Sequence, residues 1–190
     1  NLMLPPILAA LRQAEPTIQI EVVASDTNQN LLRRDADIAI RMADPTQNAL
    51  IVRKLGDTPI GLFATRAYFD RRGRITSRED LKHHDLIGLD RSDVLIRGLA
   101  GYGIHLAREE FALRTDDGLL TWQLLLAGGG VGIAQVILAR RHSELEQVHA
   151  GIGLGTLPVW LVMSEEVRSN ARIRRVADFL AAALSDLLTG

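Results

Sequence analysis

The chain contains no cysteine, no excess of either charge and no hydrophobic run of membrane-spanning length. Without cysteine there can be no disulfide, no thiolate catalysis and no Cys-ligated metal. The 22 basic and 23 acidic residues give a formal net charge of −1. A protein that binds duplex DNA usually has a basic excess or a basic stripe, so we expect no direct binding to nucleic acid. A membrane helix needs roughly 20 apolar residues, and no membrane association is expected.

The chain starts at Asn1 rather than at methionine, and no basic region of a signal peptide follows. We therefore expect a piece of a longer protein that resides in the cytoplasm, which also suits the lack of cysteine. The 190 residues are enough for one large domain or two smaller lobes with a buried core.

The spacing of apolar residues predicts alternating helices and strands. Leu4, Ile7, Leu8 and Leu11 share one face of a helix, which Glu15-Pro16 should end. Strands are expected at 18–22, 36–41, 60–64, 86–89, 111–113, 131–134 and 158–163, and helices at 25–34, 119–127, after 134 as far as 141, and 173–187. This alternation indicates an α/β fold with parallel strands covered by helices.

Five segments carry a family pattern: Leu4–Leu8 with Pro16, Leu31–Arg41, Leu62–Ala64 with Tyr68-Phe69, Leu113–Asp117, and Ala127–Ala134. Together, in this order and spacing, they resemble the effector-binding domain of LysR-type transcriptional regulators. The resemblance covers nearly the whole chain. No single segment would be specific enough by itself.

The resemblance implies a two-lobed fold like that of type 2 periplasmic binding proteins, with mixed, mostly parallel sheets and helices on both faces. Lobe I would comprise 1–60 and 161–190, and lobe II 61–160. The family also has a strand before the first helix, and here nothing precedes Asn1. We expect either an open slot in lobe I or a strand that this sequence omits.

The function implied is that of a sensor. A small-molecule effector would bind between the lobes and control DNA binding by a winged helix-turn-helix domain that this chain lacks. DNA would be contacted only through that missing N-terminal domain. The resemblance implies a side-by-side, antiparallel dimer and a tetramer of the whole protein, without catalysis, cofactor or metal. We expect the almost wholly apolar helix 119–127 to form the dimer contact, with Leu125 as a contact residue.

Candidate ligand-binding residues lie where predicted strands end, because ligands of open α/β sheets bind at the carboxyl ends of strands. The set is Ser25, Asn28, Arg41, Asp90, Arg91, Thr115, Asp116 and Gln135. Helix starts favour anionic or acceptor-rich groups, and Arg41 could hold a carboxylate with two bonds. For each residue alone, helix capping or surface charge is at least as good an explanation.

Other motifs have structural explanations. Gly128–Gly132 follows a helix and precedes a strand, the reverse of a phosphate loop, so tight packing at a helix end is expected. The five histidines lack the spacing of a helical zinc site. Adjacent Asp116-Asp117 suits helix capping better than acid–base chemistry. Trp122 and Trp160 are expected in the core or in an interface.

Two other functions share this fold. A solute-binding protein of a transport system would carry a secretion signal instead of a helix-turn-helix domain in its complete gene product. An enzyme on the same scaffold would need an acid–base set, and none is visible. We therefore rank the regulator first, the transport protein second and the enzyme last. The identity of the effector, the target genes and the direction of regulation do not follow from the sequence.

Overall fold

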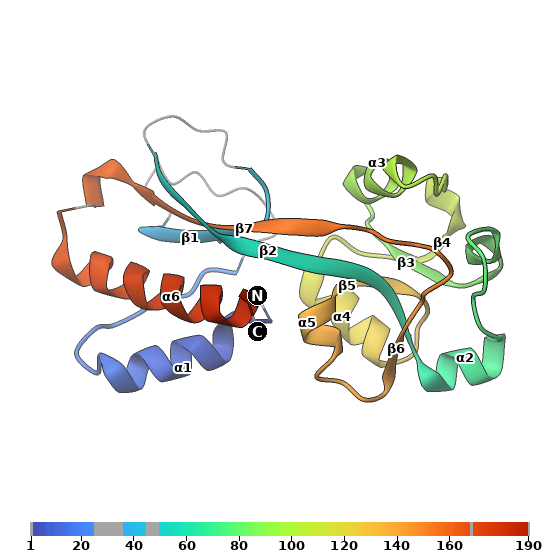
Figure 1. Cartoon of the computed structure of the whole chain (residues 1–190), viewed down its shortest axis with the longest axis horizontal. Coiled ribbons are helices and arrows are strands. Elements are labelled where there is room, and N and C mark those ends of the chain that lie inside the picture. The colour runs from blue at the N-terminus through green and yellow to red at the C-terminus, as the bar shows by residue number, and fades with distance from the viewer. Residues whose placement is uncertain (1, 25–35, 45–49, 168, 190) are drawn as a thin grey trace. The chain divides into compact units, whose positions relative to one another are not determined.

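The structure is a computed structural model that describes residues 2–24, 36–44, 50–167 and 169–189. The chain divides into two compact units, here called unit 1 (Asn1–Thr58 with Leu157–Gly190) and unit 2 (Pro59–Thr156). The main elements are α1 (Leu4–Ala14), β1 (Ile38–Arg41), β2 (Leu50–Thr65), α2 (Arg66–Arg72), β3 (Leu86–Gly88), α3 (Val94–Gly101), β4 (Phe111–Arg114), α4 (Gly118–Leu126), β5 (Gly132–Gln135), α5 (Val136–Ala139), β6 (Leu145–Gln147), β7 (Thr156–Ser164) and α6 (Ala171–Thr189) (Figure 1).

Unit 1 consists of a sheet with two helices packed on one side. β1 pairs antiparallel with β7, and β7 neighbours β2. α1 and α6 lie next to each other (Figure 1). Their apolar faces and alternate strand residues form one core, which comprises Ile7, Leu11, Leu55, Val159, Leu161, Val176, Ala177, Leu180, Ala181 and Leu184. Burying each large aliphatic side chain contributes about 1.5–3 kcal/mol.

The ends of α1 follow from its prolines. Pro5 and Pro6 lie in the first turn, where their missing amide hydrogens have no helical partner. Glu15 leaves the helical conformation with φ −128° and ψ 67°, as expected of a residue before proline. The Arg12 guanidinium then donates to the carbonyls of Pro16, at 3.1 Å, and of Ile18. These contacts hold the chain against the end of the helix.

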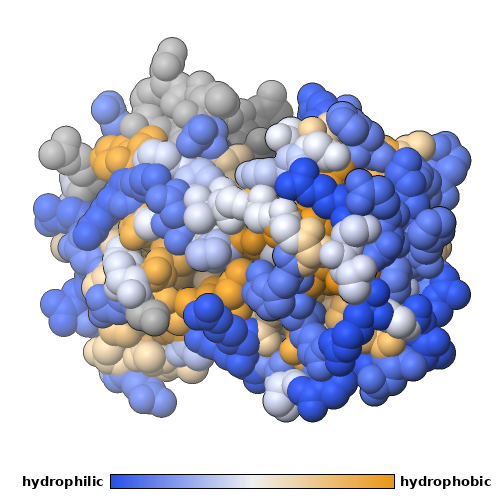
Figure 2. Space-filling model, turned by 45° about the vertical axis from the view of Figure 1, so that its right-hand side comes forward, coloured by the Kyte–Doolittle hydropathy of each residue, from blue (hydrophilic) through white to orange (hydrophobic). Residues whose placement is uncertain are grey.

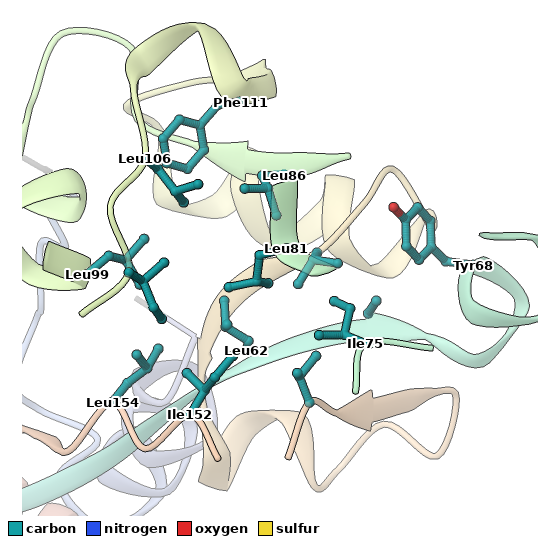
Figure 3. Close-up of a cluster of buried hydrophobic side chains, with 14 of the residues drawn as sticks. Leu62, Tyr68, Ile75, Leu81, Leu86, Leu99, Leu106, Phe111, Ile152 and Leu154 are labelled. Carbon is teal, nitrogen blue, oxygen red and sulfur yellow. The ribbon is translucent and has the colours of Figure 1, made fainter. Parts of the chain in front are cut away.

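Unit 2 combines parallel and antiparallel strands. β3 and β4 are parallel, and an isolated parallel bridge joins Leu86 of β3 to Val131, the residue before β5. β2 pairs antiparallel with both β5 and β6. The buried side chains of Leu62, Leu81 and Leu86 gather in one interior (Figure 3).

Among strand pairs with a described register, the three that include β2 or β7 are antiparallel. Parallel pairs are therefore a smaller fraction of these strand pairs than a prediction of mostly parallel sheets implies. An alternation of helices and strands along the chain does not say which strands become neighbours, so the sequence pattern could not reveal this. The mixed α/β class itself is confirmed.

The glycine run after α4 makes a tight turn, as predicted. Gly128 adopts φ +73°, which glycine tolerates best. A side chain on Gly130 would place its Cβ 2.2 Å from the carbonyl oxygen of Asp85. The run is thus a helix end packed closely against the residue before β3.

Other differences from the prediction are local. No strand is assigned to the described residues 18–24. β2 begins ten residues before the predicted 60–64. The prediction missed this part of the strand because Arg53, Lys54, Gly56 and Asp57 are typical of a loop. The helix expected to reach 141 is only α5, which ends at Ala139. The segment around Gly98 and Gly101, for which no helix was predicted, forms α3.

The surface retains apolar side chains. Figure 2 shows hydrophobic patches between hydrophilic side chains on the face in view. The large hydrophobic side chains exposed in the described residues are Val22, Val23, Val52, Val94, Tyr102, Leu119 and Leu120. Of these, Leu119 and Leu120 are consecutive residues of α4, where they are 50% and 48% exposed.

Candidate functional site

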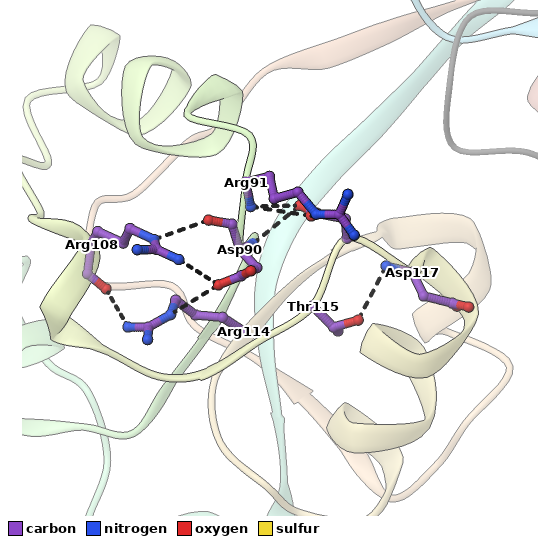
Figure 4. Close-up of polar contacts among 7 residues, drawn as sticks. Asp90, Arg91, Arg108, Arg114, Thr115 and Asp117 are labelled. Atoms are coloured by element: carbon purple, nitrogen blue, oxygen red, sulfur yellow. Dashed lines mark hydrogen bonds and ion pairs between the residues drawn. The ribbon is translucent and has the colours of Figure 1, made fainter.

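The carboxyl ends of β3 and β4 bring four predicted site residues together in unit 2. Parallel pairing puts both strand ends at the same edge. The backbone amides of Asp90 and Arg91 each donate to the Asp116 carboxylate at 3.1 Å. The amide of Thr115 donates to the carbonyl of Gly88 at 3.0 Å. We call Asp90, Arg91, Thr115 and Asp116 the strand-end cluster, and Figure 4 labels the first three of these residues.

Two arginines that the sequence did not single out hold Asp90 in this cluster. Arg108 Nη2 lies 2.5 Å from Asp90 Oδ1, and Arg108 Nε donates to the Asp90 carbonyl at 2.9 Å. Arg114 Nε lies 3.6 Å from the same carboxylate oxygen (Figure 4). The Asp90 charge is therefore compensated within the chain, which reduces its repulsion of an anionic ligand. Isolated arginines at this spacing give no recognisable sequence signal.

The Asp116 carboxylate also accepts its hydrogen bonds from within the chain. Desolvation raises the pKa of Asp116, but hydrogen bonds from the amides of Arg91, Ser92 and Asp90 outweigh it, so the pKa lies below its ordinary value. Arg91 Nε lies 3.5 Å from this carboxylate, although the Arg91 side chain is 91% exposed. Asp116 thus fixes the turn after β3, and Arg91 extends into solvent.

The start of α4 is capped by Asp117, one of the two residues predicted for this role. The Asp117 carboxylate accepts from the amide of Leu120 at 2.8 Å. Thr115 Oγ1 accepts from the amide of Asp117 at 3.1 Å (Figure 4). A threonine hydroxyl that accepts one bond can still donate one. Thr115 is therefore placed beside a helix start with a donor to offer to an acceptor group.

The remaining predicted residues are distributed along the chain. Gln135 is the last residue of β5 and lies opposite Ile60 of β2. Arg41 is the last residue of β1 in unit 1 and lies opposite Trp160 of β7. Ser25 and Asn28 lie outside the described residues. The contact of these eight residues with a ligand stays a prediction.

Within the described ranges, no group of three or more His, Asp or Glu residues is placed to hold a metal ion. In the same residues, no helix is both long enough and apolar enough to span a bilayer. The strand-end cluster consists of carboxylates that accept hydrogen bonds from backbone amides and arginines.

Comparison with known families identifies the chain. The sequence profile of the LysR substrate binding domain matches residues 1–185. The chain belongs to this family. The prediction drawn from the five short segments is thereby confirmed.

Curated relatives are transcriptional regulators by name. The HTH-type transcriptional regulator CrgA of Neisseria meningitidis serogroup B is 30% identical over 86 residues, which are 45% of this chain and 29% of that protein. The Mau operon transcriptional activator of Paracoccus denitrificans is 36% identical over 63 residues, or 33% of this chain and 22% of that protein. The aligned parts thus span less than a third of these relatives.

Solved structures share the fold. The regulatory domain of CrgA, described as a LysR-type regulator from Neisseria meningitidis, superposes with a TM-score of 0.84 at 23% identity, covering 95% of this chain and 91% of that one. The effector domain of AmpR from Pseudomonas aeruginosa gives 0.75 at 16% identity, covering 98% and 90%. These likenesses confirm the predicted two-lobed class of fold.

Proposed function

We propose that this chain is the effector-sensing part of a transcriptional regulator. It binds a small molecule and thereby controls DNA binding by a helix-turn-helix domain elsewhere in the whole protein, which acts in the cytoplasm. The observation that carries the proposal is family membership over residues 1–185. The regulator names of the relatives favour this function over a solute-binding protein of a transport system. The chain's formal net charge of −1 supports a division of labour in which another domain contacts DNA.

The strand-end cluster supports a ligand site at the edge of unit 2. Its carboxylates are occupied by the chain's own amides and arginines. Thr115 and the start of α4 then remain as groups that favour an acceptor. We infer that a ligand accepts a hydrogen bond from Thr115, and we propose separately that Arg41 takes part in ligand binding. No reaction is assigned to the chain.

We also propose that the chain forms a dimer through α4, but not through Leu125. That residue is only 1% exposed in unit 2 and cannot contact a partner. Leu119 and Leu120 are the exposed apolar residues of the helix. Leu120→Ser should shift the sedimentation coefficient toward that of the monomer. An unchanged coefficient would contradict the proposed contact.

The proposal is tested by screening metabolites for a rise in melting temperature. A ligand at 100 times its Kd stabilises by about 2.7 kcal/mol. The ligand found should then change operator binding by the whole regulator in a gel shift. Arg41→Ala and Thr115→Val should each weaken its binding at least tenfold without lowering the melting temperature of the free protein by more than a few degrees. If no ligand alters DNA binding, the chain is not an effector sensor.

A further inference from the structure

The ends of two helices in unit 1 border a hollow on the surface. It lies where α1 ends and α6 begins, two segments that Figure 1 shows on the same side of unit 1. Its volume is about 540 Å³, within the roughly 300–1,000 Å³ of small-molecule sites. We call it the helix-end hollow, and its lining includes Ala14, Glu15, Ala171, Arg174, Asp178 and Phe179.

Two alanines leave this space open. Ala14 is the last residue of α1 and Ala171 is the first residue of α6, and both are exposed. Because an alanine side chain is a single methyl group, neither residue fills the space between the helix ends. Phe179, about two turns further along α6, is half-buried against the unit 1 core and also lines the hollow. The helix-end hollow therefore has an apolar part.

Some of the polar groups at these helix ends are already satisfied. The Glu15 carboxylate, which is 17% exposed, forms an ion pair with Arg175 and so joins the end of α1 to α6. The start of α6 is capped, because the side chain of Asn170 accepts from the amides of Arg172 at 3.0 Å and of Ile173 at 3.4 Å. These groups hold the two helix ends in place and offer little to a ligand.

Two further charges of opposite sign have no partner. The side chains of Arg174 and Asp178 are exposed and line the hollow. Among the described residues, neither side chain makes a hydrogen bond or an ion pair. They are four residues apart on α6, so their Cβ atoms are about 5–6 Å from each other. An arginine that precedes an aspartate at this spacing is in the less favourable order for an ion pair within the helix.

Neighbouring charges of opposite sign select a ligand that carries both signs. An amino acid has a carboxylate and an ammonium group on the same carbon atom. The guanidinium of an arginine binds a carboxylate through two parallel hydrogen bonds, and an ammonium group has three hydrogen atoms to donate to an aspartate. A simple anion would be attracted by Arg174 but repelled by Asp178, and a simple cation would meet the reverse.

We propose that the helix-end hollow binds a free amino acid with an apolar side chain. Arg174 binds the carboxylate, Asp178 binds the ammonium group, and Phe179 contacts the apolar side chain. The hollow shares no residue with the strand-end cluster, so it is a second ligand site beside the proposed effector site. Its failure would leave the proposed effector-sensing function untouched.

The probes are L-leucine and two derivatives that each lack one of its charges. N-acetyl-L-leucine has no ammonium group, and L-leucinamide has no carboxylate. Binding is measured by calorimetry and by the NMR signals of the backbone amides of residues 171–179. L-leucine should bind and shift these signals, and each derivative should bind at least tenfold more weakly, because it leaves one charge of the hollow without a partner.

Arg174→Gln and Asp178→Asn should each weaken the binding of L-leucine at least tenfold. Arg172→Gln, at an exposed position of α6 outside the lining, removes the same charge as Arg174→Gln and should bind normally. Ala171→Leu should also weaken binding, because it fills the hollow without changing a charge. All four positions are exposed, so the free variants should melt close to the parent. The site is refuted if L-leucine does not bind, if either derivative binds as tightly, or if Ala171→Leu and Arg172→Gln behave alike.

Discussion

The two units treat buried threonine hydroxyls in opposite ways. In unit 2, Thr65 Oγ1 accepts from the amide of Tyr68 at 3.2 Å and caps α2. In unit 1, Thr58 is 0% exposed and its hydroxyl has no hydrogen-bond partner. The same contrast separates the strand-end cluster, whose carboxylates accept bonds from the chain, from Trp160 of unit 1, whose buried indole N–H has no acceptor among the described residues.

This contrast suggests different roles for these particular polar groups. A hydrogen bond made within the chain fixes a turn or a helix end and is then satisfied. An unpaired buried group is destabilising and needs another explanation, such as a ligand. Unit 2 thus presents a pre-organised edge, and unit 1 presents a donor that the fold leaves unused.

The largest expected effect concerns what the units share, a well-packed core. Leu125 of unit 2 and Leu184 of unit 1 are 1% and 0% exposed. Leu125→Ala and Leu184→Ala should each lower the free energy of unfolding by about 2–5 kcal/mol, because each leaves a cavity. Denaturant unfolding measures the change. Val94→Ala, at a site that is 57% exposed, should stay within about 0.5 kcal/mol of the parent. Equal losses in all three variants would contradict the burial pattern.

Much of the core follows from sequence periodicity. In α6, Val176, Leu180 and Leu184 repeat every four residues and are all buried, as an amphipathic helix requires. The same reasoning failed at residues 18–22, where alternating residues suggested a strand but none is assigned. Alternation shows that one face is apolar, but not that a neighbouring strand is available for pairing.

The site was predicted less completely than the fold. Strand ends could be located, and parallel pairing of β3 and β4 joined Asp90 to Asp116. The arginines at 108 and 114 were missed, because ion pairs between separate segments leave no local pattern. Trp160 was expected in the core or an interface. Its position opposite Arg41 depends on the register of β1 and β7, which the sequence does not specify.

The next effect concerns close packing in unit 2. Gly130→Ala would place a Cβ 2.2 Å from the carbonyl oxygen of Asp85, which is backbone and cannot move aside easily. We expect a loss of about 1–3 kcal/mol in the free energy of unfolding. Gly153→Ala is the control, because no atom lies within 4 Å of its added Cβ. If both variants unfold alike, the turn after α4 is looser than described.

A smaller effect tests the contrast in threonine hydroxyls directly. Thr65→Val removes the cap of α2 and should cost about 0.5–2 kcal/mol. Thr58→Val removes a hydroxyl that has no partner and should leave stability unchanged or raise it by up to about 1 kcal/mol. Thermal unfolding of both variants measures the two signs. A loss at Thr58 as large as that at Thr65 would show that the unit 1 hydroxyl is satisfied in solution.

The smallest effect depends on pH and belongs to unit 2. Tyr68 is fully buried, and its hydroxyl accepts from the amide of Asp85 at 2.8 Å. The same hydroxyl lies 3.2 Å from His84 Nδ1. Burial lowers the pKa of His84 below its ordinary 6.5, and the positive charge of Arg72 lowers it further. His84 therefore stays neutral in the folded protein at a pH where it is protonated in the unfolded chain.

The sign of the effect follows from this difference. Below about pH 6.5 the unfolded chain binds more protons than the folded protein, so stability falls as the pH falls, until the lower folded pKa is reached. His84→Gln removes this contribution. Between pH 7.5 and 5.5 its melting temperature should fall less than that of the parent, by no more than about 2 °C. His83→Gln, at an exposed neighbouring position, should retain the parent's dependence. Parallel curves for the parent and His84→Gln would mean that His84 is solvated like an ordinary surface histidine.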